Sequence, residues 1–236
     1  MKYSIVIPVN NEEENLPILI NEIKDVLHKL KGRAEVIFID DGSTDNSLNI
    51  LKQYKRKYQW IKIIKFDKKY GQSAGFDAGF KNAKGEIIIT MDADLQNRPN
   101  DIFKLLKYYP KYDVITGKRV KRKDSIIKLI SSRIANYIRN KITDENIVDT
   151  GCSLKVFKAE FVKKLKLFNG LHRFLPTLCK MEGARVIEIP VSHRPRKYGK
   201  THYGVLNRAF KALIDALAVR WMKKRFLNYK VETRIQ

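Results

Sequence analysis

Two carboxylates and a carboxamide lie within five residues of one another, and their types and spacing suggest metal chemistry. Asp92, Asp94 and Gln96 follow an apolar run at residues 86–91 that has the composition of a buried strand. Hard divalent cations such as Mg²⁺ prefer oxygen ligands of this kind. A pair of Asp residues is also common in turns and at helix caps, so this pattern alone leaves both interpretations open.

A second acidic turn follows another apolar run. The run at residues 36–39 leads into Asp40, Asp41 and Gly42. A carboxylate here can accept hydrogen bonds from a nucleotide base or ribose, and glycine permits a sharp turn. The same residues also form a good turn and helix cap, so the two interpretations are balanced when this segment is considered alone.

Strand-like and helix-like segments alternate along the first half of the chain, and each acidic turn follows one of the strand-like segments. Strands are expected at residues 3–9, 34–40, 61–66, 86–91 and 113–117, and helices at residues 15–30, 44–58, 73–83 and 99–107. Such alternation is typical of βαβ units and of a doubly wound, mainly parallel α/β sheet covered by helices on both faces. Open sheets of this type bind ligands at the carboxyl edge of their strands, where both acidic turns are expected.

Composition narrows the class of protein. A length of 236 residues suits one domain with an extension, and a net charge of +23 predicts a polyanionic partner, such as nucleic acid, anionic lipid or a phosphorylated substrate. Cys152 and Cys179 have no metal-ligand spacing and are expected to be ordinary core cysteines of a reducing compartment. We find no signal-type cleavage site and no apolar stretch of about 18 residues, so we expect a cytoplasmic chain that does not span a membrane.

Two basic amphipathic helices are expected in the second half of the chain, at residues 124–141 and at about residues 205–224. A helix of this type usually packs its apolar stripe on the core and exposes its charged face to solvent. Each Lys or Arg near anionic lipid also contributes about 1 kcal/mol to membrane binding. We therefore expect peripheral contact with the inner face of a membrane.

Several segments together resemble the inverting glycosyltransferases of family 2, and among them the polyprenyl-phosphate sugar synthases typified by dolichyl-phosphate mannose synthase. The matching segments are residues 5–15, 36–45, 92–96, 116–119, 133, 149–152 and 193–203. The resemblance covers nearly the whole chain and implies the GT-A fold, a Rossmann-like, mainly parallel sheet flanked by helices, here with C-terminal basic amphipathic helices. It implies a catalytic domain at residues 1–203, with a nucleotide-sugar-binding half at 1–118 and an acceptor-binding half at 119–203, followed by an amphipathic helix and tail at 204–236.

The resemblance implies a donor site built from the turns after the first, second and fourth strands and from a basic loop at residues 193–203. The implied donor-binding residues are Pro8, Asn10, Glu12, Asp40, Asp41, Asp92, Ala93, Arg196 and Lys200. Asn10 stands where the family usually has an aromatic residue, which removes a surface for base stacking. Asp94 and Gln96 would hold Mg²⁺ or Mn²⁺ on the donor diphosphate, where a cation neutralises the charge that the leaving group gains. Gly71 and Gly75 also match a family turn, and we expect them to serve packing.

On the acceptor side, the resemblance implies that Arg119 and Arg133 bind the phosphate of a polyprenyl phosphate, because a planar guanidinium can pair with two phosphate oxygens. The implied reaction is inverting transfer of one mannose-like or glucose-like sugar from a GDP- or UDP-linked donor. The implied catalytic residues are Asp92, Asp94, Arg119 and Asp149. Asp149 is the candidate base, and a capping role at a strand edge explains it equally well.

Two alternative functions stay open. The first is a family 2 transferase that acts on a sugar hydroxyl in glycan synthesis, although Gln96 and the pair of arginines favour a phosphate acceptor. The second is a non-catalytic basic module that binds nucleic acid, which rests mainly on the net charge. No recognition motif for nucleic acid is found, so we expect no nucleic-acid partner. A separate membrane subunit is a further candidate partner.

Overall fold

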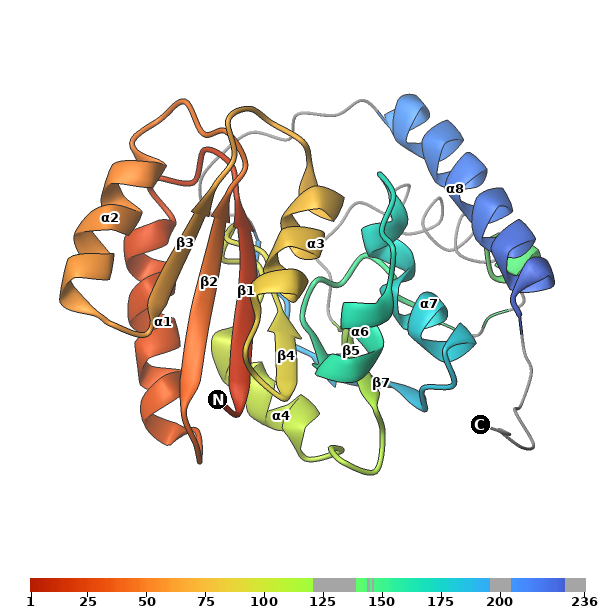
Figure 1. Ribbon diagram of the computed structural model, residues 1–236, viewed down its shortest axis with the longest axis horizontal. Coiled ribbons are helices and arrows are strands. Elements are labelled where there is room, and N and C mark those ends of the chain that lie inside the picture. Colours follow the sequence, from red (N-terminus) through yellow and green to blue (C-terminus); the bar gives the residue numbers. More distant parts are fainter. Residues whose placement is uncertain (121–138, 144, 146, 196–204, 228–236) are drawn as a thin grey trace, which may run out of the picture.

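The computed structural model describes residues 1–120, 139–143, 145, 147–195 and 205–227, and the structural statements below concern these residues. They form a seven-stranded sheet with helices packed on both faces (Figure 1). The strand order is β3-β2-β1-β4-β6-β5-β7. The expected architecture, a mainly parallel sheet flanked by helices, is therefore confirmed.

The first half of the chain alternates strands and helices as the sequence predicts. The strands are β1 (Tyr3–Val9), β2 (Ala34–Asp40), β3 (Ile61–Lys65) and β4 (Ile87–Thr90), and they are mutually parallel. The helices are α1 (Leu16–Lys29), α2 (Ser47–Lys57), α3 (Gln72–Asn82) and α4 (Ile102–Leu106), the last preceded by the 3₁₀ turn η1 (Pro99–Asp101). Helix α2 begins three residues later than predicted. The side-chain oxygen of Asn11 accepts the backbone N–H groups of Thr44 and Asp45, which keeps those residues in a loop.

The second half adds an antiparallel strand to the sheet. Strand β6 (Lys155–Lys158) lies between β4 and β5 (Val114–Arg119) and is antiparallel to both, whereas β7 (Val186–Val191) is parallel to β5. Strands β6 and β7 are not among the strands expected from the sequence. Because of this pairing, the amino end of β6 lies at the same edge of the sheet as the carboxyl ends of β4, β5 and β7.

Each face of the sheet packs on its own set of helices. One face carries α1, α2 and α4, and the other carries α3, α6 (Ala159–Lys164) and α7 (Leu175–Met181). Helix α3 approaches β1 closely because of glycine: a Cβ atom on Gly79 would lie 2.2 Å from Val6 Cγ1, and one on Gly75 would lie 3.0 Å from Pro8 Cβ. The packing role expected of Gly75 is confirmed by this contact, and Gly71 adopts a left-handed φ of +93° at the start of the helix.

Helix α8 (Val205–Arg225) packs on α7 and on the 3₁₀ turn η2 (Leu171–Phe174), so the predicted C-terminal helix is present. Its small side chains Ala216 and Val219 are buried, whereas Leu217 and Trp221 are 51% and 65% exposed. Of the other predicted basic helix, at residues 124–141, most lies outside the described residues. Within the described ranges, none of the helices combines the length and apolar character that crossing a bilayer requires.

Candidate active site

The turns after β1 and β2 are hydrogen-bonded to each other at the carboxyl edge of the sheet. Asn10 donates its side-chain N–H to the backbone oxygen of Asp41 over 2.8 Å and accepts from Lys69 Nζ over 2.7 Å. The backbone N–H of Glu12 donates to Ser47 Oγ over 2.8 Å. The predicted donor residues of these two turns are thus brought together, with the side chain of Asn10 committed to contacts within the protein.

The two acidic residues after β2 have different surroundings. The carboxylate of Asp41 is buried and accepts the backbone N–H groups of Tyr70 and Gly71, at 2.6 Å and 2.9 Å, so it fixes the turn that begins α3. Asp40 accepts one backbone N–H from Ser43 through Oδ1. Its Oδ2 atom is buried and finds no hydrogen-bond donor among the described residues. Burying a carboxylate oxygen without a hydrogen bond costs folding free energy. A ligand that donates a hydrogen bond to Asp40 Oδ2 would therefore be bound favourably.

The loop after β4 holds its acidic side chains in a constrained turn. Gln72, at the start of α3, donates Nε2 to Asp92 Oδ1 over 2.6 Å, and Asp94 Oδ1 accepts the backbone N–H of Gln96 over 3.1 Å. Asp94 is only 5% exposed, and Ala93 beside it is also buried. Leu95 adopts a φ of +60°, a left-handed conformation that side chains other than glycine rarely occupy. The backbone strain of the loop therefore lies between Asp94 and Gln96.

The charges of this loop favour a bound cation. Burial and, to a smaller extent, the neighbouring charge of Asp94 raise the pKa of Asp92 to about 6, against smaller opposing effects of Ser153, Lys155 and Arg119. A hard cation held by Asp94 and Gln96 would relieve this repulsion, because carboxylate and amide oxygens are its preferred ligands. Among the residues that the structure describes, no three His, Cys, Asp or Glu side chains gather as a metal cluster. A cation here would therefore take its remaining ligands from substrate or water.

Ser153, just before β6, joins this loop to the middle of the sheet. Its hydroxyl accepts the backbone N–H of Asp92 over 3.2 Å and the side-chain N–H of Asn97 over 2.7 Å. Its backbone oxygen accepts from Thr90 Oγ1 over 2.6 Å. No sequence pattern points to Ser153, because its partners are 56 to 63 residues away in the chain.

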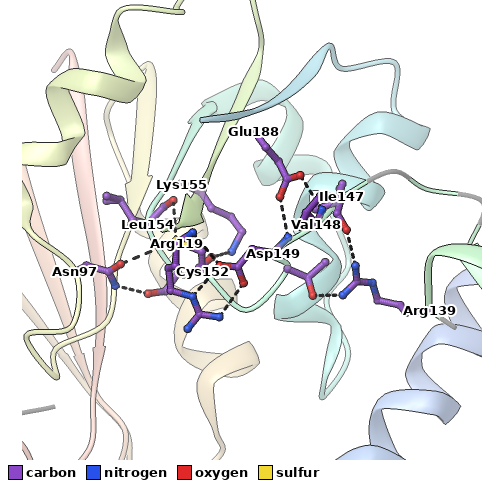
Figure 2. A network of polar contacts seen from close by, with 12 residues as sticks. Asn97, Arg119, Arg139, Ile147, Val148, Asp149, Cys152, Leu154, Lys155 and Glu188 are labelled. Atoms are coloured by element: carbon purple, nitrogen blue, oxygen red, sulfur yellow. Dashed lines mark hydrogen bonds and ion pairs between the residues drawn. The ribbon is translucent and has the colours of Figure 1, made fainter. Parts of the chain in front are cut away.

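Lys155 places a positive charge inside the sheet at the same edge. It is 3% exposed, and its ammonium donates to the backbone oxygen of Cys152 (Figure 2). Burial lowers the pKa of Lys155, although the charges of Asp92 and Asp149 favour its protonated form. Lys155 is also absent from the residues expected at the site. The only local indication is its place directly before two apolar residues, Val156 and Phe157, in a short strand.

Arg119 and Asp149 form a single ion pair at the end of β5 (Figure 2). Arg119 Nε donates to Asp149 Oδ2 over 2.8 Å, Nη2 donates to Oδ1 over 2.7 Å, and the backbone N–H of Arg119 also donates to Oδ2 over 3.0 Å. Burial by itself raises the pKa of Asp149, but the hydrogen bonds and charge of Arg119 outweigh burial and hold that pKa below its usual range. Asp149 is thus ionised at neutral pH, with both oxygens occupied.

Other predicted site residues are placed only in part. Arg133, Arg196 and Lys200 lie outside the described residues. Arg194, just before them, donates two hydrogen bonds of 2.7 Å to Glu22 of α1 and one of 3.0 Å to the backbone oxygen of Asn97. The first residues of the predicted basic loop are therefore attached to the loop that carries Asp94.

Comparison with known proteins identifies relatives that cover the site. Residues 4–166 match the family model described as glycosyl transferase family 2. Dodecaprenyl-phosphate galacturonate synthase of Rhizobium johnstonii is 35% identical over 236 residues, which cover 98% of this chain and 68% of that protein. Undecaprenyl-phosphate 4-deoxy-4-formamido-L-arabinose transferase of Photorhabdus laumondii is 36% identical over 207 residues, which cover 87% of this chain and 64% of that protein. The chain thus spans about two thirds of the length of these relatives.

Solved structures share the fold at low sequence identity. Mannosyl-3-phosphoglycerate synthase from Rubrobacter xylanophilus superposes with a TM-score of 0.71 at 14% identity, covering 100% of this chain and 79% of that one. Glucosyl-3-phosphoglycerate synthase from Mycobacterium tuberculosis, crystallised with Mn²⁺, UDP and glucosyl-3-phosphoglycerate, superposes with a TM-score of 0.68 at 15% identity, covering 93% and 79%. At this identity the likeness concerns the arrangement of strands and helices.

Proposed function

Because the chain belongs to glycosyl transferase family 2, we propose that it transfers one sugar from a nucleoside-diphosphate donor to the phosphate of a polyprenyl phosphate. Its GT-A fold agrees with membership of this family. The acceptor is supported by the two relatives above, which are named for dodecaprenyl phosphate and undecaprenyl phosphate. Their sugars are galacturonate and 4-deoxy-4-formamido-L-arabinose, so candidates for the transferred sugar extend beyond mannose and glucose.

The observation that carries the proposal is that an acidic loop and a half-buried arginine lie together at one edge of the sheet. Asp92 and Asp94 follow β4, Arg119 ends β5, and Ser153 lies between them before β6. Arg119 is near enough to Asp92 to lower its pKa. A metal-held diphosphate and a second phosphate can therefore be bound side by side, although the two anions repel each other in solution.

The donor would occupy the side formed by the turns after β1, β2 and β4. Asp40 has a carboxylate oxygen without a partner among the described residues, which could accept from a hydroxyl or a base N–H, and Asp94 and Gln96 would hold Mg²⁺ or Mn²⁺. When bound, such a cation neutralises negative charge on the leaving diphosphate. The hydrogen bond from Gln72 fixes the carboxylate of Asp92, which keeps the loop after β4 in one arrangement.

The acceptor phosphate would bind Arg119 and attack the anomeric carbon directly. A new bond forms between this carbon and a phosphate oxygen while the bond to the diphosphate oxygen breaks, so the configuration inverts. A phosphate monoester is largely ionised at neutral pH, so its oxygen needs no general base. Arg119 contributes by holding this anion next to the donor, which is a positioning effect.

We place the enzyme at the cytoplasmic face of a membrane, held by helix α8. Its bulky apolar side chains face outward beside the basic residues Arg220, Lys224 and Arg225, and a surface of this composition favours the interface of anionic lipid. The domain division at residue 203 belongs to the same proposal. It makes residues 1–203 the catalytic part and the remainder the membrane-contacting part.

The function is tested by transfer of radiolabelled sugar to undecaprenyl phosphate in detergent, with Mg²⁺ or Mn²⁺. The donors are UDP- and GDP-linked hexoses, UDP-galacturonate and UDP-4-deoxy-4-formamido-L-arabinose. We expect label in the organic phase that depends on the metal and is lost in Asp94→Ala. Donor hydrolysis without lipid labelling would instead point to a sugar hydroxyl as acceptor, and absence of both transfer and donor binding would contradict the proposal.

A further inference from the structure

The guanidinium of Arg119 is bound to the protein through one side only. Asp149 takes Nε and one N–H of Nη2. Within the described part of the chain, Nη1 makes no hydrogen bond, and the second N–H of Nη2 points to the same side as Nη1. A guanidinium has two such donor pairs, and each fits two oxygens of a carboxylate or a phosphate. The ion pair with Asp149 thus leaves one complete pair of donors available.

The loop that carries Asp149 is held from two sides by opposite charges (Figure 2). Glu188, on β7, accepts the backbone N–H groups of Val148 and Asp149 at 2.7 Å and 2.9 Å. From the other side, Arg139 donates to the backbone oxygen of Ile147 over 2.5 Å and to the hydroxyl of the residue after Asp149 over 2.6 Å. Hydrogen bonds to charged partners are about twice as strong as neutral ones, so the loop is firmly fixed.

A glycine beside the ion pair leaves room for the guanidinium. A Cβ atom on Gly151 would lie 2.8 Å from Arg119 Nη2, closer than carbon and nitrogen normally approach. Gly151 is exposed, so no core packing explains the absence of a side chain there. The same Cβ position is 3.6 Å from Asp149 Oδ1, so a side chain at residue 151 would crowd the ion pair that orients Arg119.

We propose that Asp149 is a positioning residue: it holds the Nε side of Arg119 so that the Nη1 and Nη2 side faces the acceptor phosphate, while Glu188 and Arg139 fix its loop. This inference rests on the proposed function, because it names how the acceptor is recognised. The inference also gives Glu188 and Arg139 the role of fixing the loop of Asp149, and Gly151 the role of leaving room for the guanidinium. None of these roles is expected from the sequence.

The test compares three variants that disturb the orientation of Arg119 in different ways. Asp149→Asn removes the charge of the partner. Glu188→Gln and Gly151→Ala keep the carboxylate of Asp149 and act on its loop or on the space beside Arg119. The matched control is Asp113→Asn, which removes the carboxylate from another arginine pair, with Arg185, at the opposite end of β5. Thermal unfolding of each variant shows whether it folds.

The measurements are binding of farnesyl phosphate, with farnesol as the uncharged control, and the kcat and KM of transfer with undecaprenyl phosphate. We expect Asp149→Asn to weaken phosphate binding and raise the acceptor KM about tenfold, the loss of one charge-assisted hydrogen bond, with kcat within about twofold. Glu188→Gln and Gly151→Ala should show the same pattern to a smaller degree. Asp113→Asn should leave both quantities unchanged.

The measurements distinguish a positioning role of Asp149 from general-base catalysis, and they distinguish failure of this inference from failure of the proposed function. A fall in kcat of about 100-fold in Asp149→Asn, with acceptor binding unchanged and with normal kinetics in Glu188→Gln and Gly151→Ala, would make Asp149 a general base and overturn the inference. Wild-type protein that transfers no sugar but binds farnesyl phosphate more tightly than all three variants would support the inference while the proposed function fails. Wild-type protein that binds farnesol and farnesyl phosphate equally would overturn it. Should Asp149→Asn not fold, the other two variants decide.

Discussion

Strand β5 has an arginine–aspartate ion pair near each end, and the two pairs are built in the same way. At the carboxyl end, Arg119 binds Asp149 through its backbone N–H, Nε and Nη2. At the amino end, Arg185 binds Asp113 through the same three groups, at 2.9 Å, 2.9 Å and 3.2 Å. Geometry alone therefore does not distinguish a candidate substrate contact from an ordinary link between neighbouring strands.

The surroundings of the two pairs differ. The side chain of Arg185 is 61% exposed and lies at the opposite edge of the sheet from the loops after β2 and β4, whereas that of Arg119 is 17% exposed and stands beside the loop that carries Asp92. Arg185 also uses Nη2 to bind the backbone oxygen of Pro110. An arginine becomes a candidate phosphate ligand when its free donors face an anion site in a partly desolvated place. The position of Arg119 at the carboxyl edge of the sheet, rather than the geometry of its ion pair, therefore makes it the candidate for substrate binding.

Removing each arginine should separate the two pairs most strongly. We expect Arg119→Gln to lower kcat/KM for the acceptor about 100-fold, since two charge-assisted hydrogen bonds of about 1.5 kcal/mol each are lost. Arg185→Gln should change kcat/KM less than twofold. Because Arg119→Gln also leaves Asp149 buried without its partner, the double variant Arg119→Gln/Asp149→Asn controls for folding. Equal losses of kcat/KM in Arg119→Gln and Arg185→Gln would contradict the functional difference between the two ion pairs.

Replacing each arginine by lysine should give a smaller contrast. Lysine keeps the charge but lacks the planar fork that binds Asp149 and a phosphate at once. We expect Arg119→Lys to raise the acceptor KM about tenfold and Arg185→Lys to have no effect, measured by initial rates at saturating donor. An Arg119→Lys enzyme with wild-type KM would show that charge alone suffices at this site.

The pH dependence of transfer should be insensitive to Asp149. Its pKa is held below the usual range by Arg119, so its charge is constant between pH 5 and 8. The acceptor phosphate itself changes its charge near pH 6, so a change of rate there does not require Asp149. We expect wild type and Asp149→Asn to give kcat/KM profiles of the same shape. A limb present in wild type and absent in Asp149→Asn would contradict the positioning role.

The smallest effect is expected at the exposed pair, and it concerns stability. The hydrogen bond from Arg185 lowers the pKa of Asp113, so the ionised carboxylate stabilises the fold above the unfolded-state pKa of about 4. This contribution is lost as the pH falls through the lowered pKa. Asp113→Asn should therefore lower the melting temperature slightly at pH 7, and the difference should vanish in acid. A difference that grew in acid would show that the pair acts in some other way.

The parallel half of the sheet was predictable because its signals are local. Strands β1 and β2 begin and end at the expected residues, since continuous apolar runs bounded by Asp and Gly define them within a few positions. The loops after β2 and β4 also fall where strand ends place them. The start of α2 was not predictable, because Asn11, more than 30 residues away, holds its first turn open.

The acceptor side depends on contacts that no local pattern reveals. Strand β6 has four residues with a lysine at each end, and its place between β4 and β5 follows from long-range pairing. Arg119 and Asp149 are expected from the sequence to have separate roles, whereas in the structure they are hydrogen-bonded to each other across 30 residues. Burial of Lys155 could not be read from its residue type, because lysine is rarely buried.

The central claim is that donor and acceptor are bound by different parts of one edge of the sheet. It is tested most directly by measuring two affinities, for the nucleotide donor with Mn²⁺ and for farnesyl phosphate, in Asp94→Ala and in Arg119→Gln. We predict that Asp94→Ala loses metal-dependent donor binding and keeps farnesyl phosphate, while Arg119→Gln does the reverse. Loss of both affinities to the same extent in both folded variants would contradict the division of the site.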